Sequence, residues 1–305
     1  MMRAASHPPP TTAPPNAETT PVVAATMPAV LLDANAYRKM GRVQFDALVE
    51  LERQRQVTRY AEPFALQELL AHLLDDPASK VFRSCRASVD RVYRRCAGDG
   101  PCGIIRDSES RIAEAVTGKG LAKNDEHTEQ LRLLLMHVGQ GHPLALIEPQ
   151  LRSIADHIAA EEARWADTMR RLQKNADAPQ TQKDDPMRMR IMESSRDGTA
   201  RYFLRIAGQA PSGEAVARVR RGAAGFVEFG ARIFDRVVFD RVNVDLSKIR
   251  NFLWDLRLAF NIGQTIGPRT LWVVTCDGAF AEAAAATGFG DRVYSVTAYE
   301  QWLSS

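Results

Sequence analysis

The chain has 305 residues, 45% of them hydrophobic, which is enough for one large hydrophobic core or two modest ones. No apolar run approaches the roughly 20 residues that cross a bilayer, and the N-terminus lacks a secretory signal pattern, so we expect a soluble, cytoplasmic protein. The net charge of +3 is too small to indicate a polyanionic partner, and the absence of CxxC and HExxH patterns argues against a zinc site.

The chain opens with a polar tail followed by a short apolar run. Residues 1–28 are rich in Pro, Ala and Thr and carry few large apolar side chains, which predicts a disordered tail. The run AVLL over residues 29–32 then stops at the triplet Asp33, Ala34, Asn35. This pattern predicts a buried parallel strand with a loop after it.

Helix and strand signals then alternate. Apolar residues at helical spacing predict a helix over 43–55, with charged residues on its other face. Residues 57–63 are typical of a short strand that ends at a proline. Residues 64–74 predict a second helix, which carries Glu68. The order over residues 29–75 is therefore strand, helix, strand, helix.

The pattern changes between residues 76 and 244 to long amphipathic stretches with no convincing strand. The helices that we expect there are 81–96, 128–138, 144–173 and 216–242. Segments rich in Gly, Pro, Asp or Lys predict the intervening loops at 98–103, 117–124 and 175–186. We interpret residues 76–244 as a helical bundle inserted into the alternating pattern.

Alternation resumes over residues 245–305. We expect a helix at 245–263, a strand at 270–275 that breaks at Asp277, a helix at 279–286, a strand at 292–296 and a final helix at 298–303. Alternating strands and helices at 29–75 and 245–305 predict one doubly wound parallel sheet, assembled from both segments.

Four acidic residues hold similar positions relative to the predicted strands. Asp33 and Asp277 follow strands, whereas Glu68 and Asp255 lie on helices packed behind that edge, where open parallel sheets bind ligands. Asp33 and Asp277 could equally be helix caps or turn residues, and Glu68 a solvated helix residue. Asp255 lies within the apolar stretch FLWDLRLAF, where a charge must be solvated, paired or bound to a metal.

The motifs around these acids resemble those of the PIN-domain family. They are LLDAN around Asp33, LQELL around Glu68, WDLRLAF around Asp255 and TCDGAF around Asp277, in the order typical of the family. The resemblance implies an α/β three-layer sandwich with a central parallel sheet, to which residues 76–244 add a large all-α insertion. That insertion departs from the small members of the family, which have only a few helices there.

The resemblance also implies metal-dependent phosphodiester hydrolysis, with RNA as the substrate. Asp33 and Asp277 would be the central metal ligands, and Glu68 and Asp255 would complete the site directly or through water. Carboxylates 4 Å apart repel by roughly 4 kcal/mol per pair, which a divalent cation relieves. Oxygen ligands favour Mg²⁺ or Mn²⁺. Asn35 and Thr275 would orient the ligands or the phosphate.

The insertion carries arginine-dense segments at 83–95, 188–190 and 218–221. Arginine suits phosphate binding, but on the first of these helices a solvated face is the favoured interpretation over an RNA groove. Residues 76–244 could also bind a protein inhibitor or mediate self-association, because small PIN proteins are often toxins restrained by antitoxins.

Two other functions compete with a nuclease. Haloacid-dehalogenase-like phosphatases also place an aspartate after a first strand, but they need a second acid two residues later, where this chain has Asn35. A PIN-like binding or scaffold protein without catalysis would act through the helical insertion. The presence of all four acids argues against that second alternative.

Overall fold

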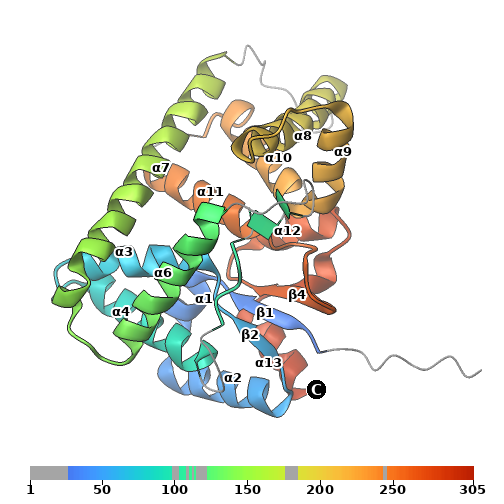
Figure 1. Cartoon of the computed structure of the whole chain (residues 1–305). Helices are drawn as coiled ribbons and strands as arrows, with labels where there is room; N and C mark the ends of the chain where they lie inside the picture. The colour runs from blue at the N-terminus through green and yellow to red at the C-terminus, as the bar shows by residue number, and fades with distance from the viewer. Residues whose placement is uncertain are drawn as a thin grey trace, which may run out of the picture.

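The computed structural model describes residues 27–97, 103–107, 110–111, 113–114, 122–175, 185–242 and 246–305. The disordered tail predicted over residues 1–28 lies outside the described residues except for its last two, and most of the loops predicted at 98–103 and 175–186 also lie outside them. The described parts form a central sheet with helices around it (Figure 1).

The first part of the chain alternates strands and helices, as predicted. Its elements are β1 (Ala29–Leu32), α1 (Ala34–Lys39), α2 (Arg42–Gln54), β2 (Thr58–Tyr60), α3 (Pro63–Ala71) and the 3₁₀ turn η1 (His72–Leu74). The six-residue α1 was not predicted. It begins directly after Asp33, whose side chain accepts a hydrogen bond from the backbone N–H of Ala36.

Helices dominate the middle of the chain. They are α4 (Lys80–Cys96), α6 (Ala122–Gly139), η2 (Leu144–Leu146), α7 (Glu148–Asn175), α8 (Pro186–Ile206), α9 (Gly213–Gly222) and α10 (Ala224–Val238). The sequence did not predict α8, and the single helix expected over 216–242 is two helices that meet at Ala223. Among the described residues of this part, Ile104 alone forms a β-bridge, and its partner is Ala61, which directly follows β2.

The last part returns to alternation, again as predicted. Its elements are α11 (Leu246–Ala259), β3 (Thr265–Ile266), β4 (Arg269–Val274), α12 (Gly278–Ala286), η3 (Gly290–Arg292), β5 (Val293–Tyr294) and α13 (Val296–Ser304). The sequence did not predict β3, which is only two residues long and forms a hairpin with β4.

The sheet combines strands from both parts of the chain. Its order is β2-β1-β4-β3, and β5 pairs with the end of β4. The pairs β1–β2, β1–β4 and β4–β5 are parallel, whereas β3–β4 is antiparallel. The fold is therefore α/β with a largely parallel five-stranded sheet, which confirms the predicted class.

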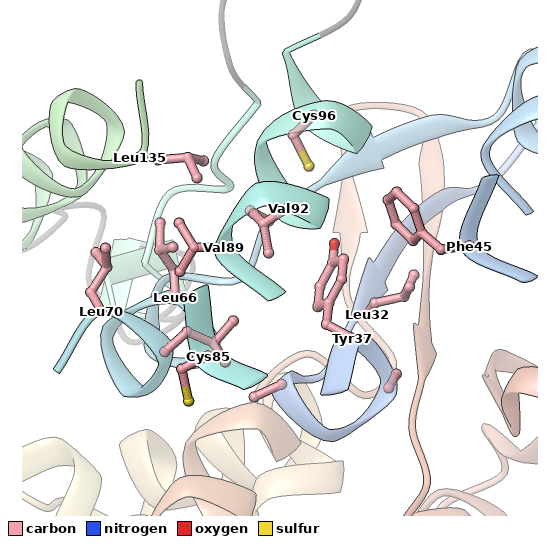
Figure 2. Close-up of a cluster of buried hydrophobic side chains, with 14 of the residues drawn as sticks. Leu32, Tyr37, Phe45, Leu66, Leu70, Cys85, Val89, Val92, Cys96 and Leu135 are labelled. Carbon is pink, nitrogen blue, oxygen red and sulfur yellow. The ribbon is translucent and has the colours of Figure 1, made fainter. Parts of the chain in front are cut away.

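Both faces of the sheet are buried against helices. Val30 and Leu32 of β1 belong to the core on one face, whereas Val273 of β4 points into the core of α10, α11 and α12 on the other. Figure 2 shows part of the first core, where Leu66, Val89 and Leu135 from α3, α4 and α6 lie close together. One core therefore joins β1 to helices of the predicted insertion.

A buried ion pair connects α4 to this core. Arg95 and Glu52 are both fully buried, and the Arg95 Nη2 donates to Glu52 Oε1 at 2.7 Å. The same guanidinium donates to the Tyr37 hydroxyl and to the Val30 carbonyl oxygen, and the Tyr299 hydroxyl donates to Glu52. The pair thereby connects five separate elements of the chain.

Arg83 and Arg94 of the first arginine-dense segment are exposed, as the favoured interpretation expects, but at least one arginine in each segment is paired with acidic residues. Arg95 ends the first segment and is buried, and Arg188 of the second is buried against Asp235 and Asp240. Arg220 of the third donates to Glu193 and Asp197. The sequence pattern did not reveal these partners, because each lies at least 23 residues away along the chain.

Candidate functional site

Three neighbouring parallel strands each lead into a helix whose N-cap is acidic. Asp33 follows β1 and caps α1, Glu62 follows β2 and caps α3, and Asp277 follows β4 and caps α12. Glu62 Oε2 accepts from the Ala65 N–H, and Asp277 Oδ1 from the Ala279 N–H, both at 2.8 Å. Three carboxyl groups therefore gather at the carboxyl edge of the sheet, near the positive ends of three helices.

The register of β1 and β4 places Asp33 beside Thr275. Leu32 is paired with Val274, and the Asp33 N–H donates to the Val274 carbonyl at 3.0 Å. The Thr275 hydroxyl donates to Asp33 Oδ2 at 2.5 Å and accepts from the Asp277 N–H at 3.0 Å. Thr275 therefore fixes the positions of both acids. Burial raises the pKa of Asp33, and these hydrogen bonds oppose that shift.

Glu68 reaches the same edge from α3. Its Oε1 accepts from the Arg38 Nη1 at 2.8 Å, and each of the two side chains is 23% exposed. Arg38 lies on α1 and also donates to the Cys85 sulfur at 3.5 Å. One guanidinium at the site therefore partly neutralises the acids, and the sequence analysis did not predict it.

Asp255 comes from α11, which packs against α3. Its pKa is raised to about 8, first by burial and then by the charge of Asp277, with which it shares a hydrogen bond. Asp33 and Glu68 raise it further. The other three predicted acids are thus close enough to influence Asp255, although the four positions span residues 33 to 277 of the chain.

A small pocket lies between these elements. Three of the four predicted acids line it, namely Asp33, Glu68 and Asp255, together with the exposed side chain of Asn35. Phe64 and Trp254 form an apolar wall, with ring centroids 6.3 Å apart. Its volume of about 30 Å³ suits a water molecule or an ion rather than a nucleotide.

Glu62 also lines this pocket, and the sequence analysis missed it. The signal was present, because the pair Glu62-Pro63 ends the predicted strand and proline favours the first position of a helix. Burial raises the pKa of Glu62 to about 8, and the charge of Asp107 adds to that shift. Asp277 does not line the pocket but contacts it through Asp255.

The donor set has the chemistry of a hard-cation site. All the predicted ligands are carboxylates, which Mg²⁺ and Mn²⁺ prefer. Within the described part of the chain, no three His, Cys, Asp or Glu side chains converge on one metal-binding point. Each acid instead has a protein partner: Thr275 for Asp33, Arg38 for Glu68, and Asp277 for Asp255. The residue types fit a divalent cation, and rotation of these side chains would be needed to bind it.

The raised pKa of Asp255 predicts that the protein becomes less stable as the pH rises. Between about pH 4 and pH 8 the folded chain holds a proton that the unfolded chain releases, so the free energy of unfolding decreases as the pH rises through this window. In Asp255→Asn we expect this decrease to be smaller by at least about 1 kcal/mol. Urea denaturation with a chelator at about pH 5 and about pH 8 measures it. Glu62 titrates in the same window, so the variant keeps part of the pH dependence of stability. An equal pH dependence in parent and variant would contradict the prediction.

No helix in the described residues is long and apolar enough to cross a membrane. No protein-family model matches the chain, and neither the curated proteins nor the solved structures compared with it give a match. The site must therefore be interpreted from its own residues.

Proposed function

We propose that the chain is a PIN-like, metal-dependent ribonuclease. The observation that carries the proposal is the convergence of Asp33, Glu68, Asp255 and Asp277 at one edge of the parallel sheet. Four carboxyl groups brought together repel one another, and a bound divalent cation would relieve that repulsion.

The order of the elements supports the PIN-like part of the proposal. A strand ends at Asp33, a helix carries Glu68, a later helix carries Asp255, and β4 leads through Thr275 to Asp277. The strand pairs β1–β2 and β1–β4 bring these elements to the same edge. This is the arrangement that the resemblance in sequence implies.

The carboxylates would hold Mg²⁺ or Mn²⁺ next to a phosphodiester. When bound, such an ion supplies Lewis-acid stabilisation of the phosphate and of the leaving oxygen, and it lowers the pKa of a bound water. Thr275 keeps Asp33 and Asp277 in position through the hydrogen bonds of its hydroxyl. The exposed amide of Asn35 lies at the pocket, where it can donate to a phosphate oxygen.

The test is to titrate Mn²⁺ into the chelator-treated protein by calorimetry and then to incubate it with a mixed RNA pool. We expect binding and Mn²⁺-dependent cleavage in the parent. In Asp277→Asn we expect cleavage to fall by about a hundredfold or more, because one carboxylate of the site is neutralised. Asparagine can still accept the hydrogen bond of the helix cap, so the fold is retained.

Asp185→Asn is the matched control. Asp185 is also the N-cap of a helix, α8, but it is half-buried and is not among the residues that line the pocket. It should bind Mn²⁺ and cleave RNA like the parent. A parent protein that neither binds Mn²⁺ nor cleaves RNA would contradict the proposal and would favour a PIN-like binding protein that acts through its helices.

A further inference from the structure

One carboxyl oxygen of Glu62 has no hydrogen-bond partner among the described residues. Oε2 caps α3 through the Ala65 N–H at 2.8 Å, but Oε1 is buried and makes no hydrogen bond with the described residues. The residue is only 1% exposed. Burying a carboxyl oxygen without a hydrogen-bond partner costs free energy. A ligand bound at this oxygen would offset that cost.

The surroundings of Glu62 keep this carboxyl group beside the acids. Its main-chain position at the end of β2 is next to β1, which leads to Asp33. Behind it lie Asp107, whose Oδ1 accepts from the Ser110 N–H, and Arg111, which donates to Asn261 Oδ1 at 2.6 Å. The charge of Arg111 acts on Glu62, but Oε1 of Glu62 accepts no hydrogen bond from the described residues, and the residue lines the pocket.

The occupant that this oxygen suits is a cation. The pocket is of ion size, and Asp33, Glu68 and Asp255 line it as well. A carboxylate at this position would strengthen the field that attracts a positive ion, whereas it would repel a phosphate group. A hard divalent cation takes six or more oxygen ligands, more than four monodentate side chains provide.

We infer that Glu62 is a fifth carboxylate of the cation site and contributes Oε1 as an oxygen ligand. The inference rests on the proposed function, because it needs the cation that Asp33, Glu68, Asp255 and Asp277 would hold. The sequence had indicated two acidic N-caps, Asp33 and Asp277, and Glu62 is the third. Each of the neighbouring strands β1, β2 and β4 is therefore followed by one acid of the site.

The test is Mn²⁺ binding by calorimetry, together with the rise in melting temperature that Mn²⁺ causes, in the parent and in Glu62→Gln. We expect the variant to bind Mn²⁺ at least about tenfold more weakly and to show a smaller thermal shift. Glu62→Ser provides a second variant, because serine is a good N-cap that lacks the carboxylate. Asp185→Asn, a cap that likewise precedes a proline, should bind like the parent.

Asp255→Asn separates this inference from the proposed function. If Asp255→Asn weakens Mn²⁺ binding while Glu62→Gln and Glu62→Ser bind within twofold of the parent, the role of Glu62 is overturned and the metal site remains. If the parent binds no Mn²⁺, both fail. The inference is supported if Asp255→Asn and both folded Glu62 variants bind Mn²⁺ more weakly than the parent, while Asp185→Asn binds like the parent.

Discussion

Replacing Arg95 with methionine is expected to lower the free energy of unfolding by about 3 to 5 kcal/mol, because it leaves a carboxylate buried without its counter-ion. Arg95 donates to both oxygens of Glu52, through Nε at 2.9 Å and Nη2 at 2.7 Å, and both side chains are fully buried. The variant also removes the donors to the carbonyl oxygens of Val30 and Tyr60. Urea denaturation followed by tryptophan fluorescence measures the change.

Two further variants make this result specific to the buried charge. Arg152→Met removes an exposed pair with Glu148, whose side chains are 67% and 46% exposed, and it should cost less than about 1 kcal/mol. The double variant Arg95→Met, Glu52→Met should recover much of the loss, because no charge is then left unpaired. An Arg95→Met protein that unfolds within about 1 kcal/mol of the parent would show that the pair does not stabilise the core.

Asp33→Asn is expected to reduce Mn²⁺-dependent RNA cleavage by about a hundredfold to a thousandfold, the range for losing one electrostatic group at a reaction centre. Asparagine keeps one oxygen that can accept from the Ala36 N–H, and its amide NH₂ can donate to the Thr275 hydroxyl in place of the second carboxylate oxygen, so the structure around β1 is preserved. Since burial raises the pKa of Asp33, the neutral side chain should leave stability in a chelator unchanged or higher. Single-turnover cleavage and urea denaturation give the two readouts.

Thr275→Val is the companion to this variant. It removes the hydroxyl that positions Asp33 and Asp277 but leaves every carboxylate in place. We expect cleavage to fall by about tenfold to a hundredfold, less than in Asp33→Asn, because partners that orient metal ligands usually have effects of this size. Cleavage by Asp33→Asn at the parental rate would exclude Asp33 from the reaction.

The sequence predicted most of the elements because their periodicity is strong. The buried run of β1 and the helical spacing of α2, α4 and α7 are of this kind. Two of the missed elements are short and have little local signal, because α1 has six residues and β3 has two, whereas α8 was missed although it has 21 residues. The break at Ala223 was also missed, because apolar residues continue at helical spacing on both sides of it.

The site could be predicted only in part. Asp33 and Asp277 were recognisable because each follows an apolar strand, and the parallel sheet places such positions together. Arg38 could not be assigned in this way, because its importance depends on which side chains from other elements face it, whereas Glu62 was missed although the pair Glu62-Pro63 marks the start of a helix. Arg95 was hidden for a similar reason: its partner Glu52 is 43 residues away.

The pairing of β1 with β4 also limits when the acidic edge can exist. β1 ends at Leu32 and β4 begins at Arg269, so a ribosome must synthesise nearly the whole intervening chain before Asp33 can meet Thr275 and Asp277. Such long-range parallel contacts form slowly, after local helices. A nuclease built on this topology has no complete site until β4 and Asp277 have been synthesised, so it cannot cleave the message that encodes it before that point.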